Sequence, residues 1–301
     1  ERMAMQRAGG LDVRGVSALE ATGLSPTLSL EGFRGGSYCP TDGCIDPPRN
    51  VRAYSLAMQR AGAELREGTA FTGLRTAPVP GGGRRVVGVE TSGGPIATEC
   101  VLLTGGPQLH EVGRLAGVRI PTGPVRHTVA VTERHEAFDV ERLPMAYDVG
   151  RGMYWRLEEG GLLFGWSAPD ESPGPARTFD PAHLAWMMAR LNALVPVTRG
   201  LGLRKAWAAT IEYSPDHLPI LGPGLDDQRR TIGGLTVASP CGHGMMGGPG
   251  IARAAADLVL RGETAVADVS ERGLDRFDAT GRSRLATDRI ALPLPTSATQ
   301  D

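Results

Sequence analysis

The chain has 301 residues, of which 41% are hydrophobic and 22% are charged, the proportions of an ordinary globular protein. Its 32 lysines and arginines balance 33 acidic residues, and the formal net charge of -1 argues against a general binder of nucleic acid or of anionic membranes. We find no apolar run of about 18 residues and therefore predict no membrane span.

The four cysteines are too few and too scattered to staple a chain of this length. Cys39 and Cys44 share a turn-rich loop, but no second pair of cysteines or histidines stands at the spacing of a zinc site. We therefore expect no metal, and we expect the reducing environment of the cytoplasm. Because the first residue is Glu1 rather than methionine, a signal or a leading domain can be missing from this sequence.

The first part of the chain predicts short strands and capped helices. A strand over residues 11–16 is followed by a helix that begins at Ser17, where Glu20 completes a capping box. A second, amphipathic helix is predicted over residues 51–61. A further strand is expected over residues 63–65.

The next segment predicts a hairpin-like pair of strands, over residues 84–90 and 95–103. Thr104, Gly105 and Gly106 then turn the chain into another helix. A glycine turn after a buried strand suits a phosphate or a ribose, but many strand-to-helix connections use glycine only to close the turn. Both uses stay open at this point.

From residue 121 the hydrophobic pattern changes to the alternation that is typical of antiparallel strands. A helix over residues 181–194, capped by Asp180, interrupts this pattern. The strands are predicted over residues 125–132, 145–149, 153–157, 162–166 and 203–213. We interpret this block as an antiparallel sheet.

The stretch 235–262 predicts a strand, a glycine-rich turn and a helix. A short apolar strand ends at Ala238, five glycines stand between Gly242 and Gly250, and apolar residues recur at helical spacing from Ile251. A turn without side chains lets a ligand approach the backbone, and the start of a helix favours a negative or electron-rich group. The alternative is a tight turn that binds nothing.

Three segments carry a resemblance to a known family: YCPTDGCIDP at residues 38–47, SPDHLPILG at 214–222 and CGHGMMGGPG at 241–250. In this order and spacing, the chain resembles the D-amino-acid-oxidase-type FAD-dependent oxidoreductases, the group that includes sarcosine oxidase and dimethylglycine dehydrogenase. The resemblance covers nearly everything from about residue 10 to residue 293.

The resemblance implies a mixed α/β fold. An FAD/NAD(P)-binding, Rossmann-like domain that is incomplete at its N-terminus is expected to hold an inserted antiparallel substrate domain. The implied divisions are 1–120 and 214–294 for the two parts of the FAD-binding domain, 121–213 for the substrate domain and 295–301 for a disordered tail.

The resemblance also implies where FAD lies. The strand around Phe71 is expected to pass the adenine, and the turn Thr104–Gly106 to touch the cofactor. The residues expected at the pyrimidine end of the isoalloxazine ring are Cys241, Gly242, His243, Gly244, Met245 and Met246.

Four side chains are candidates for the chemistry. His243 is expected beside the flavin, and His217 follows the proline–aspartate turn. Tyr154 and Arg156 stand on the substrate sheet, where Arg156 suits a substrate carboxylate as a bidentate partner. Ordinary sheet packing is the alternative for Tyr154, and a bond to the backbone of the turn is the alternative for His243.

Several positions depart from the better-known relatives. Trp207 stands where some of them carry a cysteine bonded to the flavin, so we expect non-covalent FAD. Leu163 stands where the oxidases place a lysine over flavin N5. Met245 and Met246 stand where a basic residue often receives the substrate carboxylate. A dehydrogenase that passes electrons to another acceptor therefore fits at least as well as an oxidase.

The resemblance further implies a strand–GxGxxG–helix unit upstream, and we identify no such unit in these residues. We expect an FAD-dependent oxidoreductase that oxidises the C–N bond of a secondary or tertiary amine or amino acid by hydride transfer to flavin N5. Its expected partners are that small molecule and an electron acceptor, either oxygen or a redox partner. The alternative is a flavin-free remnant or a non-catalytic assembly subunit, which implies a partner subunit.

Overall fold

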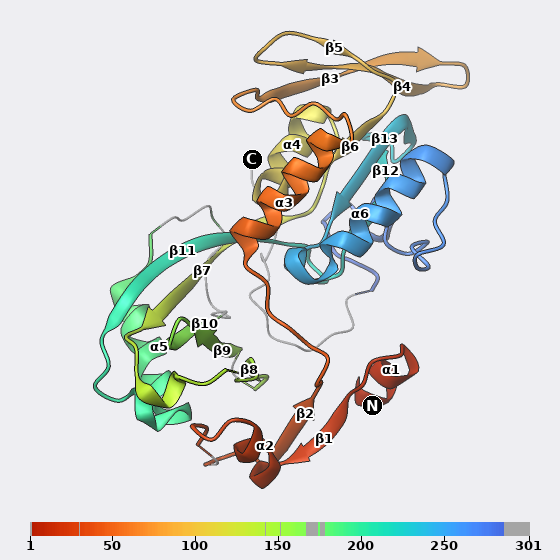
Figure 1. Ribbon diagram of the computed structural model, residues 1–301. Helices are drawn as coiled ribbons and strands as arrows, with labels where there is room; N and C mark the ends of the chain where they lie inside the picture. The colour runs from red at the N-terminus through yellow and green to blue at the C-terminus, as the bar shows by residue number, and fades with distance from the viewer. Residues whose placement is uncertain are drawn as a thin grey trace. The chain divides into compact units, whose positions relative to one another are not determined.

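The computed structural model describes residues 2–29, 31–141, 143–150, 152–166, 174 and 178–285. By their contacts the residues form two compact units. Each unit has its own sheet (Figure 1). Each also has its own hydrophobic core. The first unit is built from residues 1–46, 127–168 and 176–209, and the second from residues 47–126, 169–175 and 210–301.

The first unit begins with two short helices and a two-stranded ribbon. They are α1 (Arg2–Ala8), β1 (Arg14–Ser17), α2 (Ala18–Leu24) and β2 (Gly35–Tyr38). The predicted capping box of α2 is confirmed. Ser17 Oγ accepts a hydrogen bond from the Glu20 N–H at 3.2 Å, and a Glu20 carboxylate oxygen accepts one from the Ser17 N–H at 2.7 Å.

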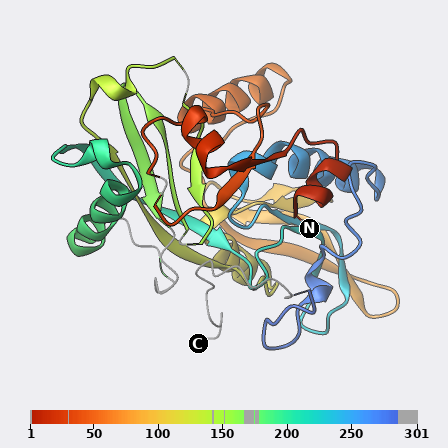
Figure 2. The same cartoon turned by 90° about the horizontal axis from the view of Figure 1, so that it is seen from below.

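A five-stranded antiparallel sheet in the order β11-β7-β10-β9-β8 follows. Its bounds lie within two residues of the prediction: β7 (Gly123–Thr132), β8 (Ala146–Asp148), β9 (Met153–Glu158), β10 (Gly161–Trp166) and β11 (Leu203–Tyr213). Helix α5 (Pro181–Leu194) has the predicted bounds, and its N-cap Asp180 accepts a hydrogen bond from the Ala182 N–H. In Figure 2, α5 lies against this sheet. The core between them includes Trp155, Phe164 and Met187.

The second unit has a six-stranded mixed sheet with the path β12-β13-β4-β3. Short strand β5 pairs with β4, and β6 pairs with β13. The strands are β3 (Phe71–Val79), β4 (Gly83–Thr91), β5 (Ile96–Ala97), β6 (Val101–Leu103), β12 (Ile220–Leu225) and β13 (Thr231–Ser239). The helices are α3 (Pro47–Arg60), α4 (Leu109–Ala116) and α6 (Gly244–Arg261), and the 3₁₀ turns of both units are η1 (Gly106–Gln108), η2 (Glu136–Phe138), η3 (Pro196–Thr198) and η4 (Leu274–Arg276).

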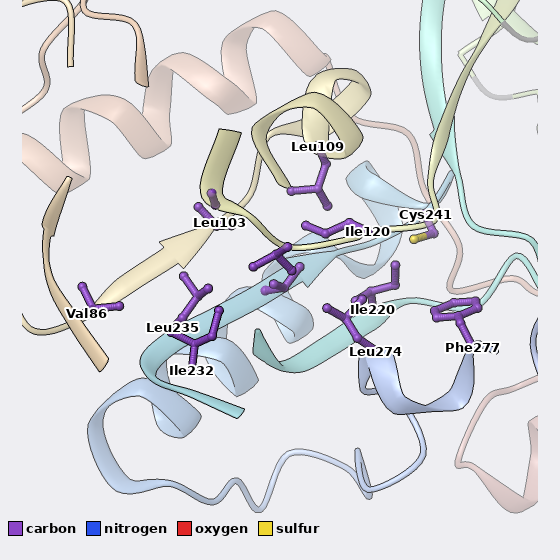
Figure 3. Packing of buried hydrophobic residues seen from close by; sticks show 13 residues of the cluster. Val86, Leu103, Leu109, Ile120, Ile220, Ile232, Leu235, Cys241, Leu274 and Phe277 are labelled. Carbon is purple, nitrogen blue, oxygen red and sulfur yellow. The ribbon is translucent and has the colours of Figure 1, made fainter. Parts of the chain in front are cut away.

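Strand β13 is the centre of this second sheet. It runs parallel to β6, with Leu235 opposite Val101, and antiparallel to β12. Burial on both faces explains why its sequence reads as a nearly continuous apolar run. One face packs on α6 through Ala254 and Ala255. A larger hydrophobic cluster joins β13 to β4, β6, α4, β12 and η4. Figure 3 shows its side chains, among them Val86, Leu103, Leu109, Ile120, Ile220, Ile232, Leu235, Cys241, Leu274 and Phe277.

Several predicted boundaries are wrong. The expected strand over 63–65 is absent from the described residues, because that segment is exposed and lies between Gly62 and Gly68, both at positive φ. The chain instead forms β3 from Phe71. The strand predicted over 95–103 is two strands, of which β5 returns to β4 and β6 joins β13.

Two helices begin earlier than predicted. Helix α3 begins at Pro47 rather than at residue 51, because proline suits the first turn of a helix. Helix α6 begins at Gly244 rather than at Ile251. The Gly247 N–H donates to the His243 carbonyl at 2.8 Å, so the glycine-rich segment itself forms the first turns.

Contacts group residues 1–46 with the five-stranded sheet, whereas the sequence analysis joined residues 1–120. Leu28 and Phe33 pack against the core of that sheet, and the Ser29 N–H donates to the Leu194 carbonyl at 2.7 Å. The roles of the two units stay predictions, and the tail 295–301 lies outside the described residues. No helix in the described part of the chain is long and apolar enough to cross a membrane.

Candidate functional site

The turn between β13 and α6 has an unusual backbone. Cys241 and Gly242 both have positive φ, at 46° and 96°. A methyl group on Gly242 would come within 2.5 Å of the Tyr213 ring, so the turn packs its bare backbone against that ring. Glycine is therefore required at this position by both conformation and space.

We expect Gly242→Ala to lower the free energy of unfolding of the second unit by about 1–3 kcal/mol, because alanine is strained at positive φ and its methyl group would overlap the Tyr213 ring. Urea unfolding followed by far-ultraviolet circular dichroism measures this loss. The matched control is Gly244→Ala, whose methyl group would meet only Pro240 at 3.5 Å. Equal losses in the two variants would contradict the assignment.

The start of α6 exposes its backbone. Gly244, Met245 and Met246 are exposed, and the first N–H groups of a helix have no intrahelical acceptor. Further along, methyl groups on Gly248 and Gly250 would meet nothing within 4 Å. Glycine inside a helix costs about 1 kcal/mol relative to alanine. Neither packing nor backbone conformation within the described residues explains these two glycines.

Residues Gly242–Gly247 also spell G-x-G-x-x-G, a match that the sequence analysis overlooked. In a dinucleotide-binding unit the helix after this motif leads to a second parallel strand. Among the described residues, the neighbours of β13 are β12, β4 and β6, which all precede it. Among the described residues no strand of this sheet follows the helix that the motif begins, so the motif is not the first turn of a βαβ unit there.

The two predicted histidines lie in the second unit, near this turn in different ways. His243 is the N-cap of α6, and its side chain makes no capping hydrogen bond. Its place beside the flavin and the alternative of a bond to the backbone of the turn both stay predictions. His217 adopts positive φ, at 57°, and its ring lies edge-on to Tyr213 with 5.2 Å between centroids. Tyr213 thus contacts both His217 and the turn at Gly242.

The turn after β6 has a packing explanation. A methyl group on Gly105 would lie 3.0 Å from atoms of Leu109 and Val112, so glycine lets the chain fold back closely onto α4. Gly106 has φ of 54°. These facts favour closure of the connection over a ligand contact for Thr104–Gly106. Phe71 begins β3 and packs against the core of the second unit.

Tyr154 and Arg156 lie on β9 in the first unit, two positions apart and therefore on one face. Tyr154 stacks on Tyr147 with 6.4 Å between ring centroids, and its ring covers Gly165. Burial raises the pKa of the Tyr154 hydroxyl to about 12, so it remains a hydrogen-bond donor. The Arg156 guanidinium already donates to Glu158, so a substrate carboxylate has to compete with that partner.

Two buried polar groups beside the turn escaped the sequence analysis. Glu212, at the end of β11, accepts a hydrogen bond from the Ser239 hydroxyl. Burial raises the pKa of the Glu212 carboxyl to about 7, an effect that the hydroxyls of Ser239 and Thr122 oppose. Only the position of an acid between Ile211 and Tyr213, at the end of the strand, signals it in the sequence.

The second group is a fully buried ion pair. Arg276 donates to both carboxylate oxygens of Asp216, at 2.7 and 3.0 Å, and to the carbonyls of Arg272 and Leu218. Burial alone would raise the pKa of Asp216, but the hydrogen bonds of Arg276 and Ser283 outweigh it and hold that pKa below its ordinary value. The aspartate of SPDHLPILG is thus a structural anchor for the chain after β13.

The volumes of the pockets do not identify a site. A pocket of about 800 Å³ in the second unit lies among β12, β13 and the end of α6, and none of the predicted site residues lines it. Among the described residues, no group of three or more histidine, cysteine or acidic side chains is placed to hold a metal ion. The exposed start of α6 therefore remains the site with a chemical rationale.

Comparison with known proteins shows what the chain is similar to. The chain is 29% identical over 273 residues to mitochondrial sarcosine dehydrogenase of Mus musculus. This match covers 86% of the chain and 29% of the dehydrogenase. It is 29% identical over 258 residues to mitochondrial dimethylglycine dehydrogenase of Mus musculus, with 80% and 28% covered. The chain therefore spans less than a third of the length of these relatives.

Solved structures share the fold. L-proline dehydrogenase from P. horikoshii matches with a TM-score of 0.79 and 23% identity, over 90% of this chain and 70% of that one. Glycine oxidase from Geobacillus kaustophilus matches with a TM-score of 0.73 and 26% identity, over 91% and 70%. The family model described as FAD dependent oxidoreductase (DAO) matches residues 1–258. The chain, with its mixed α/β fold, belongs to the FAD dependent oxidoreductase (DAO) family.

Proposed function

We propose that the chain carries the flavin end of an FAD-dependent oxidoreductase that oxidises the C–N bond of a secondary or tertiary amine or of an amino acid. The observation that carries this proposal is the bare start of α6. Its backbone is exposed at the positive end of an 18-residue helix, and Gly248 and Gly250 have no packing role within the described residues. Membership of the family and the two dehydrogenase relatives support it.

The residues present fit the flavin end of FAD. The N–H groups of Gly244, Met245 and Met246 would receive the pyrimidine edge of the ring, where the reduced flavin carries negative charge. When bound, FAD supplies the atom that accepts the hydride, and the chain supplies orientation and charge. The glycine turn at Thr104–Gly106 packs on its own helix, so this turn offers no comparable cradle for the pyrophosphate end.

We place the substrate contacts on β9. Tyr154 stays protonated and donates a hydrogen bond, while Arg156 exchanges Glu158 for a substrate carboxylate. His243 and His217 stay candidates for contacts near the reacting atoms. We further propose non-covalent FAD in the cytoplasm, and an electron acceptor that is either oxygen or a redox partner.

The test is the binding of FAD to the purified chain and to Gly248→Ala. We expect the wild-type chain to bind FAD with the visible spectrum of a bound flavin. Gly248→Ala should stabilise the chain without FAD by about 0.5–1 kcal/mol, because alanine favours the helix. It should also weaken FAD binding about tenfold, since the methyl group lies where the cofactor approaches.

The matched control is Gly23→Ala in α2, where a methyl group would also meet nothing within 4 Å. That variant should leave FAD binding unchanged. If Gly248→Ala binds FAD as tightly as the wild type, the bare helix start is not the flavin site. If the chain binds no FAD, whether alone or joined to the coding sequence upstream of it, the oxidoreductase proposal is wrong.

One observation favours the second candidate, a non-catalytic assembly subunit. Helix α3 has no buried residue, and it exposes Val51, Tyr54 and Leu56 by 58%, 56% and 43%. Exposed apolar side chains on one helix are typical of a surface that contacts another protein segment. A failure to bind FAD, together with a stable complex through α3, would establish this alternative.

A further inference from the structure

A continuous set of contacts links the end of β11 to the turn before α6. Glu212 is 5% exposed and accepts a hydrogen bond from the Ser239 hydroxyl. Ser239, which ends β13, accepts in turn from the Cys241 N–H at 3.2 Å and from the Cys241 thiol at 3.4 Å. The carboxyl of Glu212 thereby fixes the hydroxyl that orients the first turn residue.

The neighbouring residue on the same strand reinforces this arrangement. Tyr213 places its ring under Gly242, at a distance that leaves no room for a side chain there. Because successive residues of a strand point in opposite directions, Glu212 and Tyr213 reach the turn by different routes. The turn has two residues with positive φ in succession, so it needs such support to persist.

We infer that Glu212 is a positioning residue for FAD: through Ser239 it holds the turn Pro240–His243 in the conformation that presents the bare start of α6 to the flavin. This inference rests on the proposed function. Glu212 was not among the predicted site residues. It acts on the cofactor through Ser239 and through Cys241, which was predicted to lie at the flavin. Its side chain is buried, so its effect on the cofactor is indirect.

Burial of the Glu212 carboxyl makes the effect dependent on pH. Its near neighbours are the hydroxyls of Ser239 and Thr122 and the Cys241 thiol, whose own pKa burial raises to about 11. Arg276 acts on that thiol and is itself bound to Asp216. Burial raises the pKa of Glu212 to about 7. Opening the turn to water returns this pKa toward its ordinary value, so opening becomes easier as the pH rises toward 7.

The first arm of the test uses no cofactor. Amide hydrogen exchange of residues 240–246 is measured on the purified chain, on Glu212→Ala and on Glu212→Gln, as protection factors at about pH 5.5 and about pH 8.5. We expect Glu212→Ala to lose about tenfold in protection at the lower pH, because Ser239 loses its partner. Glutamine still accepts from Ser239, so Glu212→Gln should keep its protection at both values, whereas the wild type loses protection at the higher one.

The second arm measures the dissociation constant and the visible spectrum of FAD for the same variants. We expect Glu212→Ala to bind about tenfold more weakly at pH 5.5 and Glu212→Gln to match the wild type. The control is Glu99→Gln, because the Glu99 side chain is 82% exposed and pairs with Arg85 at the surface. It should change neither readout.

The two arms separate the inference from the proposed function. If the wild type binds FAD while Glu212→Ala keeps both its affinity and its exchange protection, the positioning role is wrong. If Glu212→Gln shows the same pH dependence of protection as the wild type, titration of Glu212 is not the cause and that part is wrong. If exchange shows the expected losses but no chain binds FAD, the proposed function fails while the hold on the turn stands.

Discussion

Replacing Arg276 with methionine is expected to lower the free energy of unfolding of the second unit by about 3–5 kcal/mol, because it leaves the Asp216 carboxylate buried without its cation. Both side chains are fully buried, and the pair is bidentate. The loss also removes one of the donors to each of the carbonyls of Arg272 and Leu218. The segment after β13 then loses its anchor at η4.

The measurement needs a probe in the second unit, because all four tryptophans, at positions 155, 166, 186 and 207, belong to the first. Amide exchange of β12 and β13 in increasing urea meets this need. The control Arg114→Met removes an exposed ion pair with Glu111 and should leave the free energy of unfolding almost unchanged. A similar cost for both variants would show that the buried pair has no special weight.

The second large effect is a dependence of stability on pH through Glu212. The folded state raises the pKa of this carboxyl from 4.5 to about 7, so the folded state prefers the neutral acid. The contribution is fully present below about pH 4.5 and is lost as the pH rises to about 7. Glu212→Gln keeps a neutral side chain throughout, so its stability does not change through this group. Between pH 4 and pH 8 the free energy of unfolding of the variant, minus that of the wild type, should therefore rise by about 3 kcal/mol.

The difference between variant and wild type isolates this group from others that titrate nearby in pH. Burial lowers the pKa of His127 in the first unit to about 4, so the folded state prefers the neutral imidazole. The stability that this histidine contributes is lost as the pH falls, which is the opposite pH dependence to that of Glu212. Urea unfolding of both proteins from about pH 4 to about pH 8, followed at β13 amides, gives the difference directly. A difference that does not change with pH would refute the raised pKa.

Local patterns in the sequence predicted most elements. The Ser17 capping box, the Asp180 cap and the alternation along 203–213 each depend on neighbouring residues, and each is confirmed. Errors arose where a distant partner decides the structure. Strand β6 forms because Val101 meets Leu235, and residues 63–65 remain irregular because no strand lies beside them among the described residues.

The candidate site shows the same division. The bare backbone at the start of α6 could be predicted from the sequence, because a glycine lacks a side chain wherever it lies in the fold. The pairing of Asp216 with Arg276 could not be, since it joins residues 60 positions apart. Glu212 was missed because its importance depends on burial beside Ser239, and a strand pattern does not reveal which polar residue faces the core.

The position of β13 at the centre of its sheet has a consequence for how the chain folds as it is synthesised. Val101 emerges from the ribosome long before its partner Leu235. Arg85 of β4 likewise emerges long before its partner Gly233. Closing such distant pairs is slow, and the waiting strands keep unpaired backbone and apolar side chains in solution. We expect the nascent second unit to resist proteases only after β13 and α6 have left the exit tunnel, which makes it a natural client for chaperones until then.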